Sequence, residues 1–421
     1  MFFNQGDDGK REKAKYIGKS SIDCKVINLR EVIKVKNMNC SCLYCSNNQY
    51  HVDIAAFQNK RLNGISGILR VKNDAEFLAE AIDSCIDALD ELIIVYNDCS
   101  DESPQIIKEK ALQYSKIKYY EYKPKIFANN LTKEEYQFIK EQPIESPHLL
   151  SNYYNFALSK VSYEYVMKID ADQIYQTEYL TEICNAYRAT KKVFINPWKL
   201  LCFIYFYMSL VLYKKTNRTF LLPHNRFFKY YKECLMALVH NFKIPIFLSG
   251  YNVVYYNEDW YVSLGQKNEG ALNILPPYNG ITDHLIFRLS SQTYFLPIEM
   301  EEYAQLNSHK YSLIEVLHGP KIVFPYGFIW IHLNGMRRNI YRKQVANLLR
   351  YPNRFVVFDA FVRMKSKEIS YTSDSIIFPL QNRLLYSVLH DNTDGKIMRE
   401  YIQKFSIDKT KPAFYLVKSK V

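Results

Sequence analysis

The sequence has little glycine and proline, no recognisable export signal and no apolar run long enough to cross a bilayer. Gly and Pro number 13 and 15 among 421 residues, and 48% hydrophobic with 23% charged residues excludes a fibrous or wholly disordered chain. The first residues, MFFNQGDDGKREK, lack the apolar core of a secretory signal. The longest apolar run, Leu200 to Tyr213, falls short of the ~20 residues that span a bilayer as a helix. We therefore expect a globular, cytoplasmic protein.

The charge balance is positive and the cysteines are numerous. The formal net charge is +12, which favours anionic partners such as nucleic acid, anionic lipid headgroups or phosphorylated small molecules without choosing among them. Nine cysteines without an export signal indicate reduced thiols rather than a disulfide framework.

Strand-like and helix-like segments alternate through the first half of the chain. Strand patterns at 65–71, 91–96, 116–122 and 164–169 are separated by segments with helical spacing, and 192–195 is expected to be a further strand. This alternation predicts an α/β fold with a mostly parallel sheet covered by helices on both faces. In such sheets ligands bind beyond the carboxyl ends of the strands.

Changes in composition and in hydrophobic pattern divide the chain into parts. Residues 1–62 read as an N-terminal extension, and the core is expected over 63–335. Residues 63–195 form its first half, and 196–335 form its second half, with the apolar helix inserted. Residues 336–421 are basic and helical in pattern and form an appended C-terminal element.

Two carboxylates directly follow the strand EYVMKI. Asp170 and Asp172 are spaced so that both can hold a hard divalent cation through oxygen ligands, and such a cation can neutralise a diphosphate leaving group. Helix capping and solvation at a loop is the alternative, because a D-x-D triplet alone is common. After the fourth strand of an α/β unit we favour the metal interpretation.

Five segments, in order and spacing, resemble the GT-A-fold glycosyltransferases of family 2. They are ISGILRVKND, ELIIVYNDCSDES, SNYYNFALSKVSYEYVMKIDADQIYQTEYL, FLSGYNVVYYNEDWYV and NGITDHLIFRLSSQTYFLP. The resemblance covers about residues 63 to 300, and more loosely to 335. The resemblance makes 63–195 the nucleotide-binding half and 196–335 the acceptor half. It implies an inverting transfer of a sugar from a nucleotide diphosphate donor, for which we expect a UDP-sugar. The acceptor is expected to be a hydroxyl of a glycan or lipid-linked oligosaccharide in surface polysaccharide synthesis, with Mn²⁺ or Mg²⁺ as cofactor.

The resemblance also assigns roles to residues. Asp98 matches the position that reads the base, Asp170 the ribose or metal carboxylate, and Asp172 the direct metal ligand. Asp283 matches the general base that takes the proton of the acceptor hydroxyl. By the same match, the side chains expected to help bind the donor are Arg70, Asn73 and Asn155.

Two departures from the family pattern and one competing motif accompany this assignment. Thr282 stands where an acidic residue usually precedes the base, and Asn97 replaces the first aspartate of the acidic turn. The literal pair Glu258–Asp259 is the competing base motif. We rank Asp283 ahead because the pair lacks the amphipathic helix that follows the base motif.

The residues after the last strand-like run add candidate donor-site groups. His332 can complete a Mn²⁺-type site with carboxylates and diphosphate, and a hydrogen-bonded strand-end histidine is the alternative. Arg337 and Arg338 are candidates for a diphosphate clamp or for a solvated basic face.

Cys40, Cys42, Cys45 and His51 form a C-x-C-x-x-C-x5-H pattern. Soft ligands this close together can hold zinc, but the two paired arms of a typical zinc motif are missing. The pattern therefore favours a cysteine-rich cluster without metal.

The apolar segment around Leu200 to Tyr213 is flanked by lysines. It reads as a buried core helix or a lid over the acceptor cleft, or else as an interfacial helix on an anionic membrane surface. The alternatives for the whole chain are a sugar-phosphate nucleotidyltransferase and a basic RNA-binding protein. LRVKNDAEF lacks the glycines of a nucleotidyltransferase phosphate loop, and the dispersed aromatics argue against nucleic acid as a partner.

Overall fold

The computed structural model describes residues 40, 42–46, 48–216, 227–264, 276–280, 284–299, 311–320, 322–369, 380–408 and 415–418. The helices are α1 (Leu43–Ser46), α2 (Leu78–Cys85), α3 (Ser103–Gln113), α4 (Lys133–Lys140), α5 (Leu150–Ser159), α6 (Thr177–Arg188), α7 (Pro197–Thr216), α8 (Phe228–Phe242), α10 (Arg338–Arg350), α11 (Phe358–Phe361), α12 (Leu380–Asp391) and α13 (Gly395–Ile402). The strands are β1 (Leu62–Val71), β2 (Glu91–Tyr96), β3 (Ile117–Glu121), β4 (Tyr163–Ile169), β5 (Gln173–Tyr175), β6 (Ile246–Asn252), β7 (Val254–Tyr256), β8 (Asp259–Ser263), β9 (Tyr278–Asn279), β10 (Leu285–Arg288), β11 (Tyr294–Glu299), β12 (Leu313–His318), β13 (Phe324–His332), β14 (Phe355–Val357), β15 (Phe405–Asp408) and β16 (Tyr415–Lys418).

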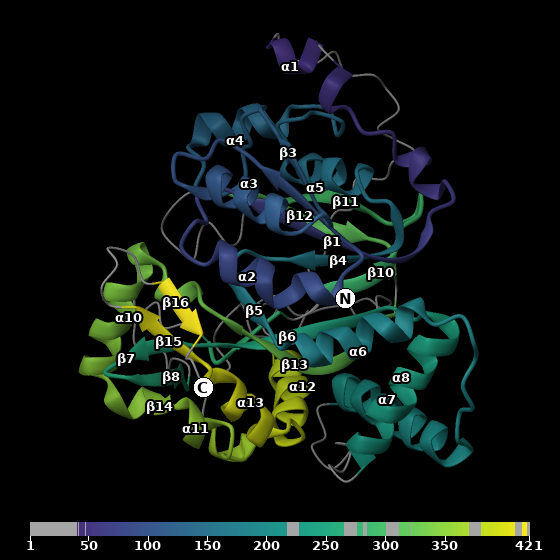
Figure 1. The fold of residues 1–421 in the computed structure, drawn as a ribbon, viewed down its shortest axis with the longest axis vertical. Coiled ribbons are helices and arrows are strands. Elements are labelled where there is room, and N and C mark those ends of the chain that lie inside the picture. Colours follow the sequence, from purple (N-terminus) through teal and green to yellow (C-terminus); the bar gives the residue numbers. More distant parts are fainter. Residues whose placement is uncertain are drawn as a thin grey trace, which may run out of the picture.

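One large sheet organises the molecule (Figure 1). Within the described residues it has nine strands, in the order β3-β2-β1-β4-β10-β6-β13-β5, with β9 paired to β6. The pairs β1–β2, β1–β4, β2–β3 and β6–β13 are parallel, whereas β10 and β5 run antiparallel to their neighbours. The predicted α/β class with a mostly parallel sheet is therefore confirmed.

Strands β1 and β2 are buried on both faces, as their near-continuous apolar runs predict. Ile65 and Leu69 of β1 point into the larger core, which includes α2, α6 and α8. Ile68 of the same strand points into the second core, against α5 and Phe57 of the segment that precedes β1. Neighbouring side chains of a strand alternate between its faces, so one strand contributes to both cores.

The expected strand over 192–195 is wrong. These residues form no strand, and Phe194 is 83% exposed. The side-chain amide of Asn241 hydrogen-bonds to both the N–H and the C=O of Val193, each at 2.8 Å. The backbone groups that a strand would pair are thus satisfied by a side chain of α8.

The basic C-terminal element packs on the rest of the molecule. Helix α10 forms where the pattern predicts a basic helix, and α11 to α13 follow it from the lower left to the lower centre of Figure 1. The element also contains strands, because β14 pairs with β8 in an antiparallel ladder. The Tyr401 hydroxyl donates to the carbonyl of Tyr175 in β5, and the Trp260 indole donates to the carbonyl of Phe405 at 3.3 Å.

Glu91, at the start of β2, connects four strands at the edge opposite the strand carboxyl ends. It is 2% exposed, accepts from the Ser66 hydroxyl at 2.6 Å and from the Ser162 amide, and pairs with Lys118 at 2.8 Å. Burial raises the pKa of its carboxyl, but Lys118, Ser162 and Ser66 outweigh burial and leave the pKa below its ordinary value.

Glu91→Gln is expected to destabilise the protein by about 2 kcal/mol at neutral pH, because the buried site loses its ion pair and one acceptor. The native carboxylate stabilises the fold above its unfolded-state pKa of about 4.3, and this stabilisation is lost as the pH falls through the lower folded-state pKa. Urea unfolding at neutral and at acid pH measures it. If the difference in the free energy of unfolding between the wild type and Glu91→Gln did not become smaller in acid, the assignment would be contradicted.

Candidate active site

Polar side chains follow four parallel strands and meet at one edge of the large sheet. Asp74 comes after β1, Asp172 after β4, and Asn252 and His332 are the last residues of β6 and β13. His332 and Asn252 are register partners in the β6–β13 ladder. The carboxyl ends of parallel strands lie at the same edge of a sheet, which is where ligands bind in such folds.

Asp172 is the most heavily engaged carboxylate of this edge. It is 5% exposed, and its Oδ2 lies 2.9 Å from both Nε and Nη2 of Arg337. Its Oδ1 lies 3.2 Å from Nε2 of His332. Burial raises the pKa of the Asp172 carboxyl, but His332 and Arg337 together lower it far below its ordinary value. Asp172 is therefore ionised at any physiological pH.

The His332 ring is held in one orientation by Asn252. Asn252 Nδ2 donates to the carbonyls of Pro276 at 2.6 Å and Tyr278 at 3.1 Å, so its Oδ1 is the atom that faces Nδ1 of His332 at 2.6 Å. Because that oxygen only accepts, Nδ1 carries the proton. In a neutral imidazole, Nε2 then presents a lone pair to the Asp172 oxygen. This contact is favourable only when Nε2 is protonated or when a cation lies between the two atoms.

Arg337 joins two carboxylates that are far apart in the sequence. Its Nη1 lies 2.7 Å from Asp74 Oδ1, in addition to its contacts with Asp172. Asp74 is itself fixed, because its Oδ2 accepts from the Lys72 amide at 2.9 Å and its own amide donates to the Ser103 hydroxyl at 3.0 Å. Burial lowers the pKa of the guanidinium, but Asp172 and Asp74 raise it above its ordinary value, so Arg337 stays charged.

Asp170 lies beside Asp172 and is more accessible. A third of its side chain is exposed, and its Oδ2 lies 3.4 Å from Nε2 of the buried His284. Gln173 accepts from the Tyr175 hydroxyl at 2.6 Å, so its amide nitrogen donates to His284 Nε2 at 2.8 Å. His284, which Gln173 holds in place, thus lies next to a carboxylate that remains open to a ligand.

The predicted base, Asp283, and Thr282 lie outside the described residues. The residue that follows Asp283 in the chain is His284, whose carbonyl accepts from the amide of Leu248 in β6 at 3.0 Å.

Three of the predicted donor-binding residues lie at the ends of β1 and β2. Asp98 has a left-handed backbone with φ 47°, its side chain is 73% exposed, and it pairs with Lys72 at 3.1 Å. Asn73 is also left-handed, with φ 55°, and its Oδ1 accepts from the Ser100 amide at 2.7 Å. Arg70 lies over the ring of Tyr154, 4.9 Å from its centroid.

Asn155 is placed differently. It is 2% exposed in α5, and its amide accepts from the N–H of Phe295 at 2.7 Å and donates to the C=O of the same residue at 2.9 Å. These contacts connect α5 to β11. The structure therefore does not bring Asn155 together with the carboxylates at the strand ends.

The departure at Asn97 has a local explanation. Its buried Nδ2 donates to the carbonyls of Tyr122 at 2.5 Å and Pro124 at 2.9 Å. An aspartate has no donor for these two carbonyls, so the amide secures the chain after β3.

The competing Glu258–Asp259 pair lies at a β-hairpin. β7 and β8 are joined by Asn257 and Glu258, which have positive φ angles of 47° and 70°. Two left-handed residues in a two-residue loop are typical of a type I′ hairpin turn. Asp259 is exposed at the start of β8.

Sequence reasoning missed Asp74, Asn252 and His284 as site residues. Asp74 follows a strand of the sheet, as Asp172 does. Asn252 lies in FLSGYNVVYYNEDWYV, one of the five segments that resemble the family, but only the β6–β13 register places it next to His332. Position at the carboxyl end of a buried parallel strand is the signal that Asp74 and Asn252 share, whereas His284 directly precedes the antiparallel strand β10.

The residues at this edge fit a divalent cation. Asp172 Oδ1 and His332 Nε2 are an oxygen and an imidazole nitrogen at 3.2 Å, a donor set that suits Mn²⁺, and Asn252 supplies the hydrogen bond that metal-ligating histidines usually make. These acidic, imidazole and guanidinium groups lie at the edge of the sheet where the family resemblance places the donor site of a nucleotide-sugar transferase.

The comparison with protein families agrees with that class. The model of the family described as beta-1,4-N-acetylgalactosaminyltransferase (CgtA) matches residues 18–316, and the chain belongs to this family. It is a glycosyltransferase. The predicted family resemblance and the enzyme class are thus confirmed.

Solved structures give only partial similarities, and no curated protein matches the chain significantly. Glucosyl-3-phosphoglycerate synthase from Mycobacterium tuberculosis, in complex with Mn²⁺, UDP and phosphoglyceric acid, is 21% identical at a TM-score of 0.18. The match covers 29% of this chain and 36% of that one. The same enzyme with Mg²⁺ and UDP matches 29% of this chain and 37% of that one, at the same identity and TM-score.

Proposed function

We propose that this glycosyltransferase moves N-acetylgalactosamine from UDP-N-acetylgalactosamine to a hydroxyl of a glycan or lipid-linked acceptor, with inversion and with a bound divalent cation. The observation that carries the proposal is the Asp172–His332 pair, in which an ionised oxygen faces a ring nitrogen at 3.2 Å. The family description supplies the sugar and the β-1,4 linkage.

The cation is assigned to Asp172 Oδ1 and His332 Nε2, with Asp170 as a second carboxylate nearby. Asn252 holds the imidazole so that Nε2 is the free nitrogen of the ring, and a cation resolves the conflict between two facing lone pairs. Bound there, Mn²⁺ or Mg²⁺ supplies charge neutralisation for the diphosphate leaving group.

Arg337 is suited to support the same leaving group. Its guanidinium is held by Asp172 and Asp74 and still has a 27% exposed side chain. A fixed positive charge at the strand edge stabilises the negative charge that develops on the departing diphosphate, without reorganising during the reaction. We propose that Asp98 and Asn73, at the ends of β2 and β1, contact the nucleoside.

Inversion follows from the anomeric configurations. The sugar of UDP-N-acetylgalactosamine is α-linked, so a β-linked product requires attack from the opposite face in a single displacement. That displacement needs a base for the acceptor proton. We assign the base to Asp283, and support comes from its chain neighbour His284, which lies 3.4 Å from Asp170.

A donor screen tests the proposal. The full-length protein is incubated with UDP-N-acetylgalactosamine, UDP-glucose, GDP-mannose and dTDP-glucose in the presence of Mn²⁺, and release of the nucleoside diphosphate is measured. We expect the fastest release from UDP-N-acetylgalactosamine. Release from none of the four, together with thermal stabilisation by single-stranded RNA instead of UDP, would contradict the proposal.

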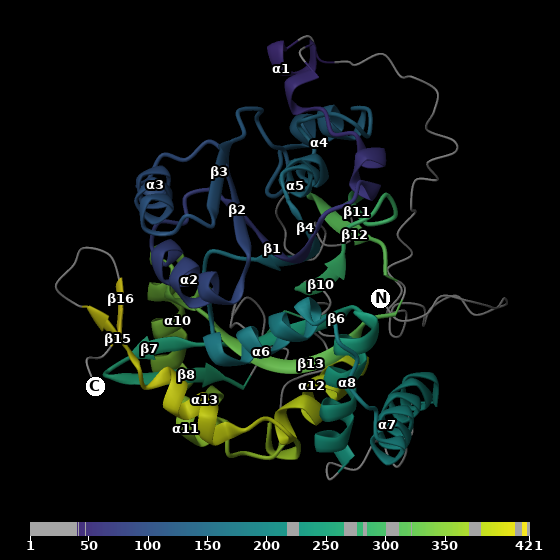
Figure 2. The same ribbon diagram turned by 45° about the vertical axis from the view of Figure 1, so that its right-hand side comes forward.

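We also propose that α7 attaches the enzyme to an anionic membrane surface. Among the residues that the structure describes, no helix is long and apolar enough to cross a membrane. Helix α7 lies at the lower right of Figure 2, packed beside α8. Its inner face contributes Phe203 and Phe206 to the core, as the buried-helix alternative predicts.

The outer face of α7 supports the interfacial alternative. It exposes large apolar side chains at helical spacing, each more than 40% accessible: Trp198, Leu201, Ile204, Tyr205, Met208 and Leu212. The neighbouring Lys191, Lys192 and Lys229 are exposed, whereas Lys199 pairs with Glu233 at 2.6 Å. An amphipathic face beside cations is suited to lie in the headgroup region of a membrane.

Leu201→Glu together with Met208→Glu is therefore expected to abolish binding to vesicles that contain anionic lipid. The wild-type protein should float with such vesicles at low salt and less at high salt, since each nearby lysine contributes about 1 kcal/mol at the surface. Flotation is the measurement, and Leu112→Glu, at an exposed position of α3, is the matched control. A wild-type protein that does not float at low salt would contradict the proposal.

A further inference from the structure

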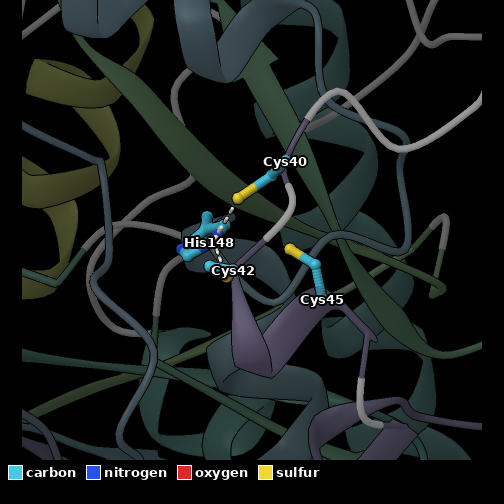
Figure 3. A group of neighbouring side chains, drawn as sticks. All are labelled: Cys40, Cys42, Cys45 and His148. Atoms are coloured by element: carbon cyan, nitrogen blue, oxygen red, sulfur yellow. Dashed lines mark hydrogen bonds between the residues drawn. The ribbon is translucent and has the colours of Figure 1, made fainter.

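Three cysteines and one histidine that the proposed transfer does not use come together around α1. Cys40, Cys42 and Cys45 precede the sheet, and His148 lies in the connection between α4 and α5. One ligand atom from each of the four residues lies within 4.8 Å of every other, and this is the one such group of three or more in the described part of the chain. Figure 3 shows the thiols and the imidazole gathered at one point.

The spacing of these atoms matches tetrahedral zinc. Nε2 of His148 lies 3.3 Å from the sulfur of Cys42 and 3.6 Å from that of Cys40. Zn–S and Zn–N bonds of about 2.3 and 2.0 Å place the ligands of a tetrahedral site roughly 3.5–3.8 Å apart. The four ligand atoms can therefore surround one ion with little movement.

The histidine is already oriented as a ligand. Its Nδ1 lies 2.7 Å from the carbonyl oxygen of Lys125, which only accepts, so Nδ1 carries the proton and Nε2 presents its lone pair to the sulfurs. A backbone carbonyl on the far ring nitrogen is a common partner of metal-bound histidine. The rings of Phe127 and Phe138 lie 5.9 and 6.1 Å from the imidazole, and His148 is 5% exposed.

We propose that Cys40, Cys42, Cys45 and His148 bind one structural zinc ion. Three thiolates and one imidazole form a closed set without an open position, which is typical of structural rather than catalytic zinc. The expectation of a metal-free cluster rested on the missing second arm of a paired zinc motif. His51, the histidine that the sequence pattern offered beside the cysteines, is exposed. The fold instead supplies His148, which lies 106 positions from Cys42 and 108 from Cys40.

The site would fasten the segment before β1 to the body of the enzyme. That segment already packs Tyr50 and Phe57 against the core beside α5. The zinc ion would add a link from its first described residues to the chain just before α5. Because metal binding to the folded state stabilises it by mass action, removal of zinc should lower the melting temperature.

Zinc content of the tag-free, full-length protein, measured by plasma mass spectrometry after expression in zinc-supplemented medium, tests the proposal. We expect one equivalent of zinc in the wild type, and little in Cys42→Ser and His148→Ala. His51→Ala and Cys99→Ser are the matched controls and should keep the full equivalent. Replacement of zinc by Co²⁺ should give the visible absorption of tetrahedral, thiolate-bound cobalt, and this measurement on the wild type decides the matter if the variants fail to fold.

Two results would overturn the proposal. The first is a wild-type protein without zinc that gives no cobalt spectrum. The second is zinc lost from His51→Ala and retained in His148→Ala. Neither the zinc content nor the cobalt spectrum depends on glycosyl transfer. The proposal of a zinc site and the proposal of the donor site are therefore tested independently of each other.

Discussion

Asp172→Asn is expected to weaken Mn²⁺-dependent binding of UDP by about 100-fold or more, and to reduce transfer at least as strongly. The variant keeps an oxygen near Arg337 but loses the charge that faces His332 at 3.2 Å. Mutation of a residue that only hydrogen-bonds to a metal ligand already lowers metal affinity or activity by about 10- to 100-fold. Asp172 is assigned as a direct ligand, so its loss should cost at least as much. Titration calorimetry with UDP, with and without Mn²⁺, measures the loss.

The control for this change is Asp87→Asn, which removes one exposed carboxylate from the segment after α2. It should bind UDP and Mn²⁺ as the wild type does. Circular dichroism and urea unfolding establish that Asp172→Asn is folded, since a buried carboxylate that pairs with Arg337 also contributes to stability. A folded Asp172→Asn protein with unchanged affinity would remove the metal assignment.

Asp283→Asn is expected to keep donor and metal binding but to lower kcat by about 10²- to 10⁴-fold, the usual contribution of a general base. An amide has no basic oxygen for the acceptor proton. The measurement is the transfer rate at saturating donor, so that a binding defect is not counted as loss of chemistry.

Asp259→Asn is the matched comparison, and it should retain most of the wild-type rate. Asp259 follows a hairpin turn at the start of β8 and is exposed. If Asp259→Asn were inactive and Asp283→Asn active, the literal Glu-Asp pair would be the base motif and the assignment would be reversed.

The strands were predictable because a parallel sheet that is buried on both faces needs continuous apolar runs. The pattern ELIIVY coincides with β2, and EYVMKI differs from β4 by one residue. The segment 192–195, KVFI, is also a short apolar run, but the side chain of Asn241 in a later helix takes the backbone hydrogen bonds of Val193. A side-chain partner so distant in the chain leaves no local signal.

The site was predictable to the extent that its residues follow strands. Asp170, Asp172 and His332 were named from that position, and the structure brings them to the same edge. The Arg337–Asp74 ion pair and the Asn252–His332 bond depend on which strands are neighbours, which the sequence does not state. Asn155 has a position in the sequence that resembles a donor-site residue, yet its contacts are with the backbone of β11.

The most direct test of a cation-dependent, inverting N-acetylgalactosaminyltransferase needs no acceptor. Proton NMR follows UDP-N-acetylgalactosamine during slow hydrolysis by the enzyme and identifies the anomer of the sugar first released. We predict the β anomer, with release stopped by EDTA and restored by Mn²⁺ rather than by zinc. Release of the α anomer, or release that continues unchanged in EDTA, would contradict the account.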